Sequence, residues 1–148
     1  MSVLPSSPDP SSPLHYPSSR TALLLLDYHN SVVDICGETG LSAVRQARIL
    51  RDWAICQEIP VIHCLVDVNG TRLPTAKGGD HLRSFLAAAE GEAGEEHIDL
   101  RFLDGEKEVR VLRQPGLRSG LKSQGIGELL GERNIKASLQ RGTLTMCW

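Results

Sequence analysis

The chain has 148 residues, 41% of them hydrophobic, and a formal charge of -2 at pH 7. That length is sufficient for one domain with a buried core. Because the net charge is small and negative, it provides no general attraction to nucleic acid or to anionic lipid, so we expect small molecules or proteins as partners.

Serine and proline dominate residues 1–19, a composition typical of disorder, and we predict one folded domain over residues 20–148. No apolar run approaches the roughly 18 residues that span a bilayer, and the N-terminus lacks the pattern of a signal peptide. The four cysteines lie far apart without C-x-x-C spacing, which argues against a zinc site or a disulfide framework. We therefore expect a cytoplasmic protein.

The first half of the chain predicts two buried strands and the helix that joins them. An apolar run follows Arg20 and ends at Asp27, as expected of a strand that is covered on both faces. Apolar residues recur at helical spacing over 41–57, and a β-branched run over 59–66 predicts the second strand.

The second half continues the alternation of helices and strands. We predict a helix over 81–89, a strand over 108–112, a glycine-weakened helix over 119–132 and a fourth strand from about Ile135. This order predicts an α/β fold: a parallel sheet with right-handed crossovers and helices on both faces.

The predicted strand ends carry no phosphate-binding signature. Neither G-x-G-x-x-G nor G-x-x-x-x-G-K-[ST] occurs in the chain, which disfavours dinucleotides and nucleoside triphosphates. We expect no cofactor and no metal.

Three segments together resemble a known family. They are the strand that ends in Leu26-Asp27-Tyr28-His29-Asn30, the stretch Ile59-Pro-Val-Ile-His63, and the stretch from Val109 to Leu121. In order and spacing they resemble the isochorismatase-like cysteine hydrolases over roughly residues 21–145. The resemblance implies a three-layer α/β/α fold of Rossmann-like topology.

The resemblance also implies a catalytic trio of aspartate, lysine and cysteine. Asp27 stands at the position of the family's general base, which a partly buried strand end suits. As an alternative, Asp27 is an N-cap or turn residue. At the lysine position the chain has Arg113, with Lys122 as a competing candidate that more simply is a surface charge.

Cys147 is the counterpart of the family's nucleophile. The segment Gly142-Thr-Leu-Thr-Met-Cys147-Trp148 approximates the family motif G-x-x-T-x-x-C, but its cysteine comes one residue early. The family's nucleophile opens a helix whose N-terminus lowers the thiol pKa, and no residue after Trp148 provides that helix here. The competing interpretation is that Cys147 has no catalytic role.

The fourth predicted strand contains polar residues where the family has a central strand. Gln140 and Arg141 occupy positions that would be buried there, and relatives continue with further strands. We therefore expect a C-terminally truncated or frame-altered family member. Its sheet would end in an exposed edge that favours association, including association with a second copy of the chain as a homo-oligomer.

Three other residues have candidate roles. His29 is a possible metal ligand because it lies beside Asp27, although no matching His-x-His spacing accompanies it. His63 and Cys64 lie within the second apolar run and are expected to line the core or a pocket.

Two functions remain open. In the first, the chain is a hydrolase of a small amide or a related C-N or C-O bond, in which Cys147 attacks, Asp27 transfers protons and Arg113 stabilises negative charge. In the second, it is a catalytically inactive member that acts as a binding or oligomerising module. The sequence does not identify the substrate.

Overall fold

Four parallel strands form the centre of the protein, in the order β3-β2-β1-β4. The computed structural model describes residues 7–74, 79–102 and 105–142. The strands are β1 (Thr21–Leu26), β2 (Val61–Val66), β3 (Glu108–Arg113) and β4 (Ala137–Gly142). The helices are α1 (Asn30–Cys56), α2 (Gly79–Ala88) and α3 (Ile126–Glu132), and five short 3-10 turns lie between elements.

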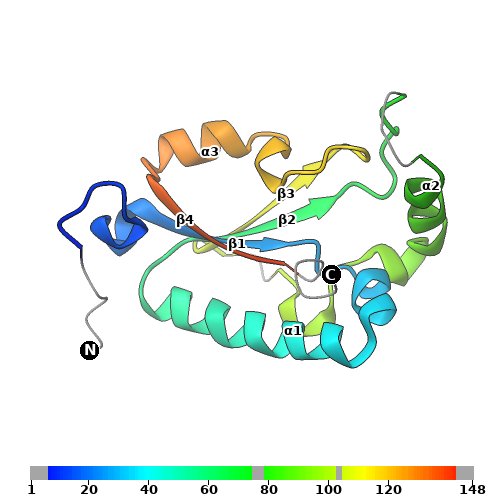
Figure 1. Cartoon of the computed structure of the whole chain (residues 1–148), viewed down its shortest axis with the longest axis horizontal. Helices are drawn as coiled ribbons and strands as arrows, with labels where there is room; N and C mark the ends of the chain where they lie inside the picture. The colour runs from blue at the N-terminus through cyan, green and yellow to red at the C-terminus, as the bar shows by residue number, and fades with distance from the viewer. Residues whose placement is uncertain (1–6, 75–78, 103–104, 143–148) are drawn as a thin grey trace.

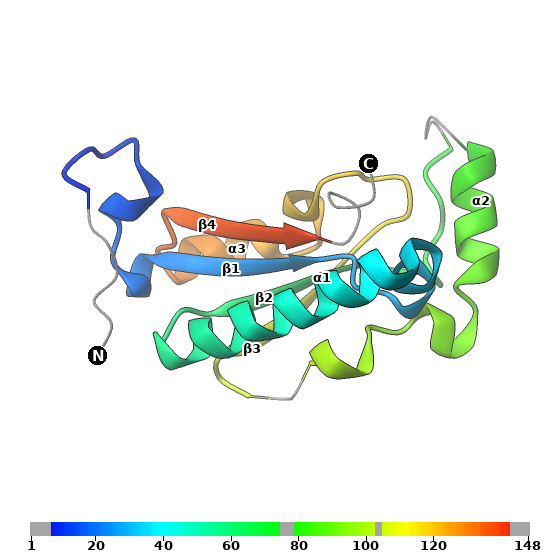
Figure 2. The ribbon, with the colours of Figure 1, turned by 60° about the horizontal axis from the view of Figure 1, so that its bottom comes forward.

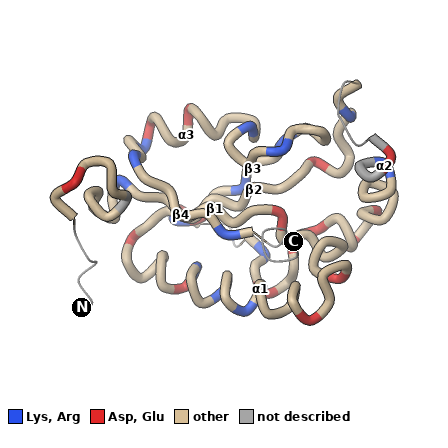
Figure 3. The backbone as a smooth tube through the Cα atoms, viewed as in Figure 1, with Lys and Arg blue, Asp and Glu red and all other residues tan. Residues whose placement is uncertain are grey.

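Helices cover both faces of this sheet, which confirms the predicted three-layer α/β/α architecture. The long helix α1 runs along one face and α3 lies on the other, while α2 stands beyond the carboxyl ends of the strands (Figures 1 and 2). Both basic and acidic residues lie along α1 (Figure 3), where Arg45 pairs with Glu38 at 2.8 Å.

Alternating residues of β1 supply the two hydrophobic cores, one on each face of the sheet. Leu23 and Leu25 pack with α1, whereas Ala22 and Leu24 pack with Ile126 of α3. Each strand in a covered sheet needs apolar residues on both faces, which explains the unbroken apolar run of β1. Because side chains alternate, a shift of β1 by one residue would exchange the two cores.

The first helix begins at Asn30, not near residue 41 as the sequence predicted. Its backbone leaves helical geometry at Gly37, whose φ of 54° and ψ of -133° mark a kink within the helix. The residues before the kink include the buried Val32 and Val33, which belong to the core. The prediction was wrong because the kink changes the face that points inward, so no single helical period fits both parts.

A turn replaces the first half of the predicted helix over 119–132. A 3-10 turn covers Gly120–Lys122, and α3 begins only after Gly125, which has a φ of 76°. A residue in this left-handed conformation interrupts regular helical geometry, and glycine adopts it without steric cost. The strand β4 likewise begins at Ala137, two positions beyond Ile135.

The polar residues of β4 are not buried in the part of the sheet that the structure describes. Among the described strands β4 is the outermost and pairs with β1 alone. Gln140 is exposed and Arg141 is half-buried. The described sheet therefore ends at β4, in agreement with the exposed edge that the sequence predicted.

Three findings concern expectations outside the sheet. Residues 7–20 contain short turns at Pro13–His15 and Ser18–Arg20, and the disorder of residues 1–19 stays a prediction. No helix among the described residues is long and apolar enough to cross a bilayer. Cys36 is disulfide-bonded, so the spacing of the cysteines did not exclude a crosslink.

We predict that two glycine substitutions will have opposite effects on stability. A Cβ at Gly127, on the exposed side of α3, meets no atom, so Gly127→Ala should raise the unfolding free energy by about 0.5–1 kcal/mol. A Cβ at Gly40 would collide with the backbone carbonyl of Val33, so Gly40→Ala should lower it by about 1–3 kcal/mol. Urea unfolding measures both changes in the unfolding free energy. If both substitutions raised it, or both lowered it, the close packing at Gly40 or the open space at Gly127 would be contradicted.

Candidate active site

Asp27 lies directly after β1, at the end of the sheet where parallel strands present their carboxyl ends. Its backbone N-H donates to the carbonyl of Cys64 at 3.0 Å, which extends the pairing of β1 with β2 by one residue. Its φ is 61°, a left-handed conformation that is uncommon for a residue with a side chain. Such backbone conformations concentrate at functional sites, because the surrounding structure must hold them in place.

Arg113 ends β3 and forms a bidentate ion pair with Asp27. Its Nη1 and Nη2 donate to Oδ1 and Oδ2 at 2.6 and 2.7 Å, and its Nε donates to the carbonyl of Leu117 at 2.8 Å. Since β2 lies between β1 and β3, the guanidinium reaches across the end of β2. The side chains of Arg113 and Asp27 are only 6% and 15% exposed.

The structure thus brings together two of the three residues that the family resemblance selected. Cys147 lies outside the described residues. Lys122, the competitor of Arg113, lies on the 3-10 turn Gly120–Lys122 and lines a cavity of about 380 Å³ that Arg113 also lines. Asp67, Gln114 and Gln124 also line this cavity, so a small polar space lies beside the ion pair.

Cys64 is the described cysteine nearest to this pair in the sheet, but it is not suited to nucleophilic attack. Burial raises the pKa of its thiol to about 12; the charge of Asp27 acts in the same direction and that of Arg113 in the opposite one. The side chain is fully buried. Because the thiolate is the nucleophilic form, Cys64 is a core residue, as the sequence predicted.

His29 packs as a structural residue rather than a metal ligand. Its Nδ1 donates to the carbonyl of Gly94 at 2.8 Å, and its Nε2 accepts the backbone N-H of Val66 at 3.1 Å. These two bonds engage both ring nitrogens. Among the described residues no group of three or more histidine, cysteine or acidic side chains is arranged to hold a metal ion.

A buried histidine and two glutamates form a polar cluster that the sequence analysis did not detect. His63 of β2 is fully buried, and its ring nitrogens contact Glu96 at 2.6 Å and Glu108 at 3.2 Å. Glu96 also accepts the backbone N-H of Phe102, and Arg51 of α1 lies 3.8 Å from Glu108. The sequence showed only that His63 lies within an apolar run. That placement predicted a core or pocket position but did not predict the two glutamates.

Comparisons with known proteins identify the fold. An isochorismatase from Pseudomonas putida KT2440 superposes with a TM-score of 0.62 and 19% identity, covering 89% of this chain and 63% of that one. The fold is isochorismatase-like. A cysteine hydrolase from Pseudomonas syringae pv. phaseolicola 1448A has 16% identity and a TM-score of 0.49, over 86% of this chain and 61% of that one. No protein-family model and no curated protein matches the chain.

The likeness to the isochorismatase extends over most of this chain but not over the whole of that enzyme. The chain spans 63% of its length. At 19% identity the superposition establishes the arrangement of strands and helices, not the chemistry.

We predict that the pair of Asp27 and Arg113 is energetically coupled. Arg113→Met removes the two hydrogen bonds to a nearly buried carboxylate and should cost about 3–5 kcal/mol of unfolding free energy. The double variant Asp27→Leu with Arg113→Met should recover at least half of that loss, because no buried charge remains. Urea unfolding of the parent, the two single variants and the double variant measures the coupling energy. If the effects of the two single substitutions simply add in the double variant, the coupling energy of the pair is zero.

We also predict a large difference in reactivity between two thiols. A pKa near 12 leaves about one Cys64 thiol in ten thousand ionised at pH 8, whereas Cys56 is an exposed free thiol. A thiol reagent followed by peptide mapping should label Cys56 within minutes and Cys64 only after unfolding. Rapid labelling of Cys64 in the folded protein would contradict its burial.

Proposed function

We propose that this protein belongs to the isochorismatase-like cysteine hydrolases and hydrolyses a small amide or a related C-N or C-O bond. The observation that carries the proposal is the bidentate pair of Asp27 and Arg113, which joins the ends of two parallel strands in an isochorismatase-like fold. Ligands of open α/β sheets bind beyond the carboxyl ends of the strands, where this pair lies.

Each residue of the proposed mechanism has one chemical task. In the reduced protein, Asp27 takes the proton of the Cys147 thiol, whose sulfur then bonds to the carbonyl carbon of the substrate. The proton passes to the leaving amine as the C-N bond breaks, and water, deprotonated by Asp27, then hydrolyses the thioester. Arg113 holds the carboxylate in place and supplies positive charge for the developing oxyanion.

A second candidate function is a catalytically inactive binding or oligomerising module. One observation favours it: both carboxylate oxygens of Asp27 already accept hydrogen bonds from Arg113. A general base must reach the proton that it removes, so this pair would have to loosen before Asp27 could act. The exposed side chains of β4 provide a surface on which a second copy could pair.

The remaining expectations from the sequence accompany this proposal. We propose a small-molecule substrate and a cytoplasmic location, with no cofactor and no nucleic-acid or membrane partner. The homo-oligomer stays a prediction that light scattering will test.

The test is turnover of a panel of small amides by the protein and three variants. Asp27→Asn and Cys147→Ser should each lower kcat by about 100-fold or more, because each removes a group that transfers a proton or forms a bond. Arg113→Lys keeps the charge but loses the planar fork, so a loss of about tenfold is expected. Cys56→Ser, at an exposed thiol, serves as the control with unchanged turnover.

Two results would decide against the hydrolase. The first is absence of turnover by a protein whose circular dichroism shows the folded state, which favours the inactive module. The second is turnover that Asp27→Asn and Cys147→Ser leave unchanged, which would place the chemistry elsewhere.

A further inference from the structure

A cavity near the strand ends lies on the other face of the sheet from the Arg113 side chain. Its volume is about 750 Å³, within the range of small-molecule sites. Along β3, Val109 and Val111 pack in the core on the α3 side, and Arg113 shares their orientation. Arg110 and Leu112 point the other way and line this cavity, which neither Asp27 nor Arg113 lines. Leu112 and Asp67 also line the smaller cavity beside Arg113.

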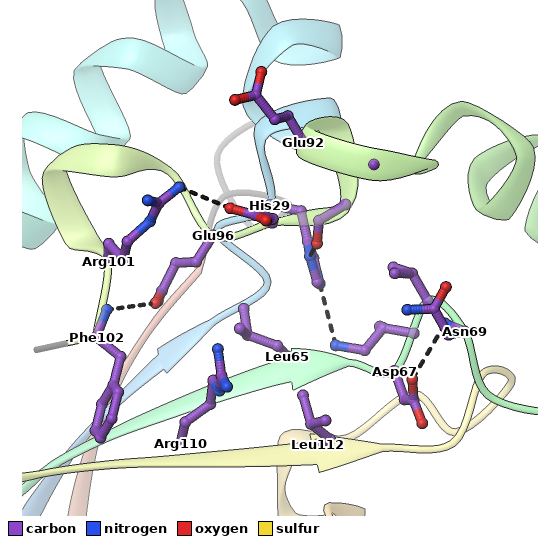
Figure 4. A pocket seen from close by; sticks show the side chains of 15 residues that line it. His29, Leu65, Asp67, Asn69, Glu92, Glu96, Arg101, Phe102, Arg110 and Leu112 are labelled. Atoms are coloured by element: carbon purple, nitrogen blue, oxygen red, sulfur yellow. Dashed lines mark hydrogen bonds and ion pairs between the residues drawn. The ribbon is translucent and has the colours of Figure 1, made fainter. Parts of the chain in front are cut away.

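The cavity has an apolar floor and a wall of irregular chain. Figure 4 shows Leu65 and Leu112 rising from β2 and β3 towards the segment 91–102, with Phe102 at one side. The wall is fixed in place, because His29 binds the carbonyl of Gly94 and His63 binds the carboxylate of Glu96. The site is therefore largely preformed.

Most of the charged groups around the cavity already have partners. Arg101 donates to Glu95 at 2.7 Å, and Glu96 is held by His63 and by the N-H of Phe102. Asp67 accepts the backbone N-H of Asn69 at 3.2 Å. Glu92 lies at the rim, with its carboxylate turned away from the strands in Figure 4.

Arg110 differs from the other charged groups because it forms no ion pair with any residue that the structure describes. Its guanidinium carbon lies 5.9 Å from the centre of the Phe102 ring, and Figure 4 shows the group directed from β3 into the cavity. A guanidinium offers a fork of donors that matches a carboxylate, and here apolar and aromatic surfaces flank it.

We propose that this cavity binds a small carboxylate with an aromatic or apolar body. The carboxylate pairs with Arg110, and the body lies on Leu65, Leu112 and Phe102. This site does not depend on the proposed hydrolase, because neither Asp27 nor Arg113 lines the cavity.

Titration of the full chain with benzoate, followed by calorimetry or by NMR shifts, tests the proposal. Benzoate should bind saturably, whereas benzamide, its neutral analogue, should bind at least tenfold more weakly. Inorganic phosphate separates general anion binding from recognition of a carboxylate with an apolar body, and it should also bind at least tenfold more weakly than benzoate.

Variants place the binding at Arg110. Arg110→Gln should weaken benzoate binding at least tenfold, and Leu112→Glu should do the same by placing a carboxylate beside the guanidinium. Arg45→Gln, a change on the outer side of α1 at a side chain that is 58% exposed, should leave binding unchanged. Asp27→Asn should also leave it unchanged, which separates this site from the proposed active site.

The proposal is overturned if benzoate shows no saturable binding, or if benzamide or phosphate binds as tightly as benzoate. It is equally overturned if folded Arg110→Gln and Leu112→Glu proteins bind benzoate as the parent does. Circular dichroism of each variant establishes that it is folded, and the two substitutions act through different residues, so the failure of one variant to fold leaves the other as the test.

Discussion

The ion pair between Asp27 and Arg113 links the ends of β1 and β3, two strands that are not hydrogen-bonded to each other because β2 lies between them. The guanidinium spans the end of β2 to reach the carboxylate that follows β1, and it also holds the loop after β3 through the carbonyl of Leu117. Two charges this far from solvent are stable only when their geometry is matched on both sides. This contact depends on the left-handed backbone of Asp27, on the register of β3 against β2 and on the path of the loop after β3.

The same contact bears on both proposed functions. In the proposed hydrolase Asp27 would be well positioned as a base but not yet free to act, because both of its oxygens are bound by Arg113, whose charge is directed at the carboxylate. Both groups of the closed ion pair are engaged with each other, which is the arrangement that a purely structural role requires. What separates the two functions is whether the pair opens when a ligand enters, which is a property of the site rather than of the fold.

The sequence predicted those features that depend on neighbouring residues. The apolar runs of β1 and β2 and the placement of Asp27 at a strand end followed from local pattern, and parallel strands bring such ends to one edge of a sheet. The predicted start of α1 was wrong because Gly37 changes which face of the helix points inward. The partners of His63 were beyond prediction, since Glu96 and Glu108 lie 33 and 45 positions away in the chain.

His29 has a wider consequence than its own two hydrogen bonds. It stands two residues after Asp27, and its ring joins the end of β2 to Gly94 in the wall of the cavity that contains Arg110. One imidazole therefore fixes both the chain beside the ion pair and the wall of the cavity, so the position of that wall relative to the sheet depends on a single side chain.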